Sequence, residues 1–204
     1  MRFRWLAVLA AAATTGCGYN TIQTYDEQAA QAKQQIDVQL RRRADLIPNL
    51  VATVKGYAAQ EEAIFTEVSR AHAGLVGALN QPGGGDPREL ANANAGVTRA
   101  LGPFLTLVQA YPQLKSDVQF LRLQDELTGT ENRIAVARTD YNQSVQQYNT
   151  YIRRFPAAMT AKVTGAKPRE YFEETDPAAR EVPKVDFGKA PPAGGAPATP
   201  AATP

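Results

Sequence analysis

The feature that most constrains the fold of this chain is a seven-residue repeat of large apolar residues near its C-terminal end. The repeat consists of Leu127, Ile134, Tyr141, Tyr148 and Phe155. Because an α-helix turns once every 3.6 residues, a sustained spacing of seven keeps these side chains on one face and predicts helices packed in a left-handed supercoil, as in a coiled coil. No stretch of comparable length alternates apolar and polar residues with a period of two, so strands are not expected.

Two earlier stretches also follow helical spacing. The first contains Tyr25, Ala29, Ala32, Ile36, Leu40 and Ile47, and the second contains Leu50, Val54, Tyr57, Ile64, Val68, Ala71, Leu75 and Leu79. Pro48 lies between them, where it disfavours helix at the preceding residue but suits the first turn of a new helix. The sequence therefore predicts an all-α fold, an antiparallel up-and-down bundle of four long helices, or of three with the first one kinked at Pro48.

Glycine and proline mark the boundaries between these stretches. The run from Asn80 to Pro87 contains three successive glycines and predicts a loop, Tyr111-Pro112 predicts a second break, and Phe155-Pro156 ends the last long stretch. We therefore expect a bundle over residues 17–156, an irregular segment packing on or beside it over residues 157–187, and a disordered tail rich in proline and alanine over residues 188–204.

The N-terminus has the pattern of a lipoprotein signal peptide. Arg2 and Arg4 precede a short apolar run from Trp5 to Ala13, and small residues lead to Cys17, the only cysteine of the chain. A span across a bilayer needs about 20 apolar residues, so this run is too short. We expect cleavage of residues 1–16 and attachment of palmitate-type acyl chains to Cys17; the alternative is an uncleaved anchor with an incidental cysteine.

Charge and cysteine content exclude several classes of function. Removal of residues 1–16 takes away two of the 22 basic residues and none of the 20 acidic ones, which leaves a balanced chain without the basic field that nucleic-acid binding requires. Once Cys17 is acylated, no thiol remains for a disulfide or a redox site. The single histidine, His72, excludes a multi-histidine metal centre, so we expect no cofactor.

Several longer motifs resemble the LemA family of bacterial membrane-associated proteins. They are Gly18-Tyr19-Asn20-Thr21-Ile22-Gln23, the run from Ile36 through Arg42-Arg43-Ala44-Asp45-Leu46-Ile47-Pro48-Asn49 to Ala58, Ala110-Tyr111-Pro112-Gln113-Leu114-Lys115, Leu123 to Leu127, Thr130 to Arg138, and the pairs Tyr141-Asn142 and Tyr148-Asn149. The resemblance covers roughly residues 19–187 and implies a helical bundle on an N-terminal membrane anchor, in the bacterial cell envelope and facing the periplasm or the cell exterior. It implies no activity. The sequence departs from the family pattern at Lys33, Gln60 and His72.

Polar residues interrupt two of the apolar stripes. Glu61 lies in the stripe of the second stretch, while Gln124, Glu131 and Arg138 follow seven-residue spacing in the last one. Because buried charge is costly unless it is paired, we expect these four side chains to face one another in a buried polar layer that fixes helix register. The alternative is a ligand or catalytic site built on the carboxylates.

Three successive arginines, residues 41–43, raise the question of a membrane contact. Arg41 follows Cys17 by 24 residues, which is roughly 36 Å along a helix axis and several Debye lengths from the headgroups. We expect these arginines either to pair with Asp37 and Asp45 or to contribute to an interaction surface made of Arg42, Arg43, Asp45 and Asn49.

These observations favour a non-enzymatic, lipid-anchored helical protein that binds or scaffolds a protein partner. Two alternatives stay open: an enzyme with a carboxylate-based site in the bundle, and a membrane-remodelling protein with amphipathic helices. The apolar stripes lack the Lys, Arg and Trp flanks typical of helices that insert into a membrane interface.

Overall fold

The computed structural model describes the backbone of residues 2–174 and the side chains of residues 18–174. In chain order the helices are α1 (Arg2–Lys55), α2 (Glu62–Leu79), α3 (Pro87–Val108), α4 (Pro112–Lys115), α5 (Val118–Tyr151) and α6 (Ala157–Thr164). The described residues contain no strand, which confirms the expected all-α class. The side chain of Cys17 and the whole of the expected tail, residues 188–204, lie outside the described residues. Within those residues, no helix combines the length and the apolar character needed to cross a bilayer.

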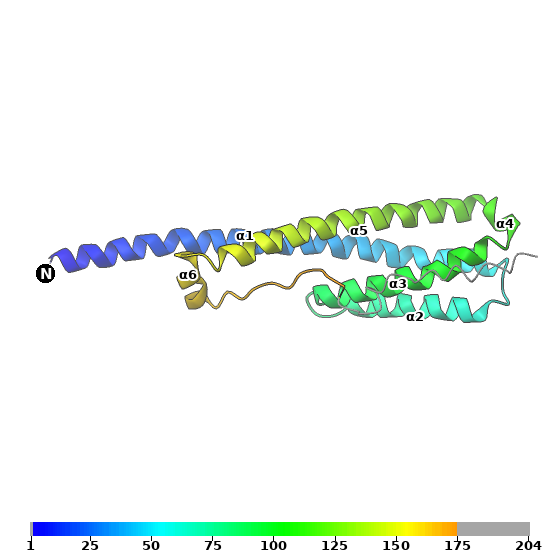
Figure 1. Ribbon diagram of the computed structural model, residues 1–204, viewed down its shortest axis with the longest axis horizontal. Coiled ribbons are helices and arrows are strands. Elements are labelled where there is room, and N and C mark those ends of the chain that lie inside the picture. The colour runs from blue at the N-terminus through cyan, green and yellow to red at the C-terminus, as the bar shows by residue number, and fades with distance from the viewer. Residues whose placement is uncertain (1, 175–204) are drawn as a thin grey trace, which may run out of the picture.

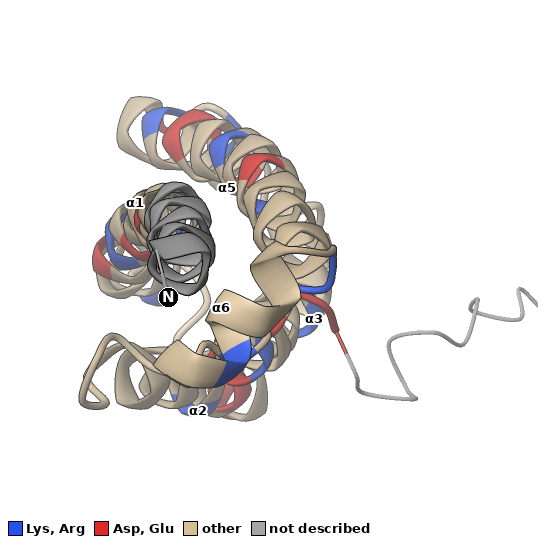
Figure 2. Ribbon diagram, turned by 90° about the vertical axis from the view of Figure 1, so that its left-hand side faces the viewer, with Lys and Arg blue, Asp and Glu red and all other residues tan. Residues whose placement is uncertain are grey.

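The molecule is a rod of two long helices with a shorter pair packed against one half of it (Figure 1). Helices α1 and α5 lie side by side and run in opposite directions, and α2 and α3 form the shorter antiparallel pair. Seen along the rod, α1 lies between α5 and α2 (Figure 2). We call the end that carries α6 the proximal end, because α6 packs against the early part of α1, and the end that carries α4 the distal end.

Helix α1 continues through Pro48, which agrees with the alternative of one continuous helix and not with a boundary at this residue. Pro48 is exposed, and the helix loses only one backbone hydrogen bond there. The chain breaks later, over residues 56–61, beginning at Gly56, and the second predicted stretch is therefore divided between the end of α1 and the whole of α2. Both parts bury their apolar residues in the same core, which is why the pattern looked continuous in the sequence.

One main core runs along the rod. It contains Leu127, Ile134 and Tyr141 of the seven-residue repeat, together with apolar residues from α1, α2 and α3. A second, smaller cluster at the proximal end is formed by Ile22, Tyr148, Ile152 and Ala161. Phe155, the last residue of the predicted repeat, lies beyond the end of α5 and is 82% exposed, so the prediction that it belongs to the buried stripe is wrong.

Local sequence explains where the shorter helices begin and end. Asp86 caps α3 by accepting hydrogen bonds from the backbone N–H groups of its first turn, and Pro87 occupies the first helical position. Asp117 caps α5 in the same way through the N–H of Phe120, at 2.8 Å. Gly165 ends α6 in the left-handed conformation, with φ of 73°. The expected breaks at the glycine loop and at Tyr111-Pro112 are confirmed.

Candidate functional site

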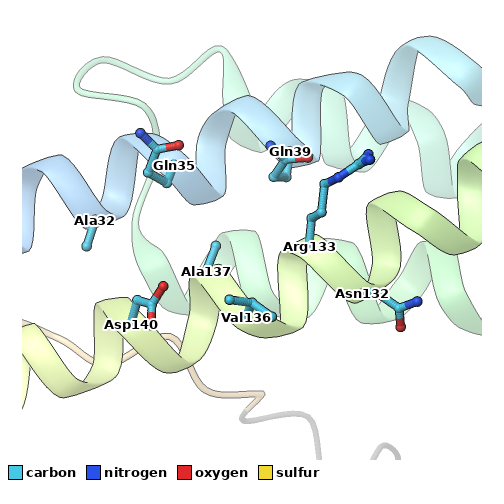
Figure 3. Close-up of a pocket in the computed structure, with 8 residues that line it drawn as sticks. All are labelled: Ala32, Gln35, Gln39, Asn132, Arg133, Val136, Ala137 and Asp140. Atoms are coloured by element: carbon cyan, nitrogen blue, oxygen red, sulfur yellow. The ribbon is translucent and has the colours of Figure 1, made fainter.

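A groove runs between α1 and α5 on the side of the molecule away from α2 and α3. Its volume is about 520 Å³. The lining residues are Ala32, Gln35 and Gln39 of α1 and Asn132, Arg133, Val136, Ala137 and Asp140 of α5. Figure 3 shows Ala32 and Ala137 on the facing sides of the two helices at different positions along the seam, and Arg133 extending from α5 toward α1. Both alanines line the groove, and larger side chains at these two positions would fill part of it.

The walls of the groove are mostly apolar, with polar groups at the edges. Val136 is 62% exposed, which is unusual for a β-branched apolar residue at the centre of a long helix. The side-chain oxygen Oε1 of Gln39 is buried and has no hydrogen-bond partner among the described residues. Unsatisfied buried acceptors are rare in folded proteins, and this one marks a gap in the hydrogen bonding of the seam beside the groove.

The seam between α1 and α5 continues past both ends of the groove. Toward the distal end, Arg42 Nη2 lies 3.9 Å from Glu126 Oε2 and bridges the two helices. Toward the proximal end, a second hollow of about 370 Å³ lies between the helices. Its lining residues are Tyr25, Gln146, Gln147, Thr150, Tyr151 and Arg154. The contact between α1 and α5 is therefore interrupted by two hollows along its length.

The structure divides the four residues of the expected interaction surface. Arg42, Asp45 and Asn49 are exposed on α1, whereas Arg43 is only 1% exposed and belongs to the core. Arg43 therefore cannot contribute to a surface, and that part of the expectation is wrong. No ion pair of the described residues joins these arginines to Asp37 or Asp45, contrary to the expected pairing: Arg41 donates to the carbonyl of Leu79 at 3.0 Å, and Asp37 pairs with Lys33 at 3.1 Å.

Arg43 joins three helices at the centre of the rod. Its guanidinium donates hydrogen bonds to Asn94 Oδ1 at 2.7 Å and to Thr98 Oγ1 at 3.1 Å, and it forms an ion pair with Glu131 Oε2 at 2.6 Å. Burial lowers the pKa of Arg43 from its ordinary value, and the charge of Glu131 acts in the opposite direction. The cluster holds α1 against α3 and α5 in one register, because its hydrogen bonds and its ion pair are lost if a helix shifts; Arg43 Nε is buried and has no partner among the described residues.

The structure does not bring the four residues of the expected polar layer together. Glu61 is the N-cap residue of α2, Arg138 is exposed on α5, and no hydrogen bond or ion pair of the described residues joins either of them to Glu131 or Gln124. Glu61 is not part of a buried apolar stripe because it lies in the break between α1 and α2. The polar layer that does form is built on Arg43, which the sequence assigned to the surface.

Two asparagines of α5, seven residues apart, hold the segment that follows α6. Asn142 accepts from the backbone N–H of Phe172 at 2.8 Å and donates to its carbonyl at 3.2 Å. Asn149 does the same with Arg169, at 2.9 Å in both directions. This role was not predicted from the sequence, although the Tyr-Asn pair occurs there twice, at residues 141–142 and 148–149. An asparagine side chain has the same donor and acceptor groups as a peptide. Asn142 and Asn149 therefore form with the backbone of this segment the hydrogen bonds that a neighbouring β-strand would form.

The same segment is anchored to α1 by an ion pair. Arg169 contacts Asp26 through two hydrogen bonds, Nε to Oδ1 at 2.7 Å and Nη2 to Oδ2 at 3.0 Å. Hydrogen bonding to Asp26 raises the pKa of Arg169. Burial raises the pKa of Tyr141 to about 12, and its hydroxyl donates to the carbonyl of Glu170. Residues 169–172 are thus fixed in place by both α1 and α5.

Lys33, one of the departures from the family pattern, fastens the glycine loop to α1. Its ammonium donates to the carbonyls of Gly83 at 3.1 Å and Gly84 at 2.9 Å, and to Asp37. Burial raises the pKa of Asp37, although Lys33 acts in the opposite direction. Gly84 has φ of 80°, and a Cβ atom there would collide with the Asp37 carboxylate. This carboxylate is therefore covered by the loop.

Among the described residues, no three His, Cys, Asp or Glu side chains come together in a way that could hold a metal ion. His72 is half-buried in a hollow between α1 and α2 that also contains Pro48, Lys55 and Ser69. The lining of that hollow contains no carboxylate that could orient the imidazole for proton transfer.

Comparison with known proteins gives a consistent result. Residues 32–187 match the model of the LemA family. Magnetosome proteins MamQ 1 and MamQ 2 of Paramagnetospirillum magneticum are each 32% identical to this chain over 189 residues, covering 83% of this chain and 70% of theirs. Magnetosome protein MamQ of Magnetospirillum gryphiswaldense is 30% identical over the same shares of both chains.

Proposed function

This chain belongs to the LemA family, and from that premise we propose that it is a non-enzymatic, membrane-anchored scaffold whose α1–α5 groove binds a helical segment of a partner protein. The observation that carries the proposal is the groove itself, which is elongated, mostly apolar and open along one side of the rod. An amphipathic helix that places its apolar face in such a groove is a recurrent mode of protein recognition. The exposed Val136 supplies an apolar contact, and the exposed Gln35 and Arg133 supply polar ones.

The anchor in this proposal is a lipid attached to Cys17. A thioether-linked diacylglycerol with a further N-acyl chain provides the two or more chains that stable attachment requires. The intact mass of the membrane form tests this directly, because removal of residues 1–16 and addition of acyl chains change the mass in opposite directions. Retention of residues 1–16, or unchanged processing in a Cys17→Ser variant, would contradict the lipid anchor.

The relatives bear on location. They are named as magnetosome proteins, and we infer from them and from the N-terminal sequence that this protein also works at a bacterial membrane. With the anchor at Cys17, the rod stands on the outer side of the membrane and carries the groove away from the lipid surface.

The seven-residue repeat of α5 further supports a left-handed supercoil of an up-and-down bundle.

Crosslinking tests the groove. A photoreactive amino acid at Gln35, on the rim of the groove, should give a discrete adduct with one partner protein in the native membrane, whereas the same group at Ala73, exposed on α2, should not. The Val136→Arg change should abolish the adduct by removing the apolar wall. Because Val136 is mostly exposed, that change should leave the thermal midpoint within about 2 °C of the original. An adduct that survives Val136→Arg, or one that forms equally at Ala73, would refute binding in the groove.

The enzymatic alternative has less support among the described residues. Glu131, one of the carboxylates on which it was based, is held by Arg43. Asp37, whose pKa is raised by burial, lies beneath the glycine loop and lines none of the hollows described above. A candidate general base must reach a substrate, and neither Glu131 nor Asp37 lines the groove; Asp140 does, but it is the only carboxylate in that lining.

A further inference from the structure

Helix α6 exposes its large apolar side chains and buries small ones. Met159 and Val163 of α6 are 63% and 88% exposed, and Phe155, in the turn just before the helix, is 82% exposed. The opposite face carries Ala157 and Ala161, which are buried. A helix on the surface of a water-soluble domain normally does the reverse, because burial of the larger side chains gives the greater hydrophobic free energy.

The surroundings of α6 are basic and contain no acid. The sequence has no Asp or Glu between Asp140 and Glu170. The exposed cations of this stretch are Arg153, Arg154, Lys162 and Lys167. No hydrogen bond or ion pair within the described part of the chain engages these four side chains, in contrast to Arg169, which pairs with Asp26. Apolar side chains flanked by unpaired cations are typical of a helix that lies in the interface of an anionic membrane.

The position of α6 fits the same conclusion. It packs against the early part of α1 at the proximal end, and in the view along the rod it lies toward the reader (Figure 2). A Cβ atom placed on Gly18 would lie 3.3 Å from Thr160 Oγ1 of α6. Gly18 directly follows Cys17 in the sequence. Helix α6 therefore lies beside the residue to which the proposed function assigns the acyl chains.

We propose that α6 is a second membrane contact, in which Phe155, Met159 and Val163 enter the interface of a bilayer and the four cations bind anionic phospholipid headgroups. The inference rests on the proposed lipid anchor for its orientation. With a lipid at Cys17 as the sole attachment, the rod could rotate freely about that point. A second contact beside Cys17 fixes the angle between the rod axis and the membrane. The groove between α1 and α5 then points in one direction relative to the membrane surface, which a scaffold requires.

Tryptophan fluorescence tests this contact in the full chain. Trp5 is the only tryptophan, so a Trp5→Phe background allows one reporter to be placed at a time. Val163→Trp places it on α6, and Val118→Trp places it at another highly exposed valine, at the distal end. The proteins are reconstituted into vesicles of phosphatidylcholine with phosphatidylglycerol, carrying brominated acyl chains as quenchers. We expect the reporter at 163 to shift to shorter wavelength and lose most of its emission, and the reporter at 118 to be unaffected.

A charge variant tests the role of the headgroups. Replacement of all four cations by glutamine should reduce quenching at 163 in these vesicles to the level found in phosphatidylcholine alone. Equal quenching at 163 and 118, or a wavelength shift at 163 without quenching by bromine, would overturn the proposal; the second result would indicate contact with protein, such as another copy of this chain. Quenching that is unchanged in the charge variant would overturn the assignment of anionic headgroups.

The anchor and the α6 contact can fail separately. Flotation with the vesicles and an acylated mass, without quenching at 163, would leave the anchor standing and refute the contact. An unacylated mass with quenching at 163 would refute the anchor and support the contact.

Discussion

Replacement of Glu131 by alanine should lower the free energy of unfolding by about 2–3 kcal/mol, because it leaves the guanidinium of Arg43 buried without a counter-charge. Breaking a fully buried ion pair costs about 3–5 kcal/mol. The side chain of Glu131 is 46% exposed, so water screens part of the interaction and the lower estimate applies. For a chain of this size the loss corresponds to a fall of about 4–12 °C in thermal midpoint.

The measurement is thermal and urea unfolding of the mature protein, followed by circular dichroism at the helical band. Arg138→Ala is the matched control, since Arg138 is exposed one heptad further along the same helix and has no partner among the described residues. It should change stability by less than about 0.5 kcal/mol. If Glu131→Ala and Arg138→Ala unfold at the same midpoint, the reasoning about the buried guanidinium is wrong.

A double substitution separates the ion pair from the rest of the cluster. Arg43→Met removes the charge but leaves Asn94 Oδ1 unpaired, which should cost about 1–3 kcal/mol. Once Arg43 is absent, Glu131→Ala should cost little more, so the two changes should be non-additive by at least about 1 kcal/mol. Simple additivity would show that the two side chains do not interact in solution.

Three further predictions concern the segments that pack on the rod. Gly85→Ala should destabilise the protein by more than about 1 kcal/mol, because φ is 76° and the new Cβ would overlap the carbonyl oxygen of Ala78 in α2. The control is Gly83→Ala, which has a similar φ but open space around it and should cost less in the same unfolding assay. Asn149→Ala should release the segment after α6, seen as faster amide exchange over residues 165–174, and Asn132→Ala on the exposed face of α5 should not. Burial raises the pKa of Asp37 above 3.8, its ordinary value. The folded protein therefore loses stability as the pH rises from the unfolded pKa of this carboxyl through its folded pKa. Because Asp37→Asn cannot ionise, its stability relative to the original protein should increase across that pH window in urea unfolding.

The sequence alone was sufficient for the helical class, because apolar periodicity is a local property of the chain. The seven-residue repeat of α5 is buried from Leu127 to Tyr148, and the glycine loop and the break at Tyr111-Pro112 are where composition placed them. The turn between α1 and α2 could not be predicted in the same way. Pro48 is a stronger local signal for a helix end than Gly56. An exposed proline, however, removes only one hydrogen bond from a long helix, and the tertiary packing of α1 stabilises the helix by more than that loss.

The pairing of polar residues was decided only by the tertiary structure. Arg42 and Arg43 are adjacent in sequence and chemically identical, yet Arg42 is exposed on α1 while Arg43 is buried against Asn94 and Glu131. Successive residues on a helix point about 100° apart, so the direction of each one depends on how α1 is rotated relative to α3 and α5. The groove has the same origin. The sequence provides small residues on both helices, but a hollow exists only because the packing of α1 against α5 places Ala32 and Ala137 in the lining of the same stretch of the seam.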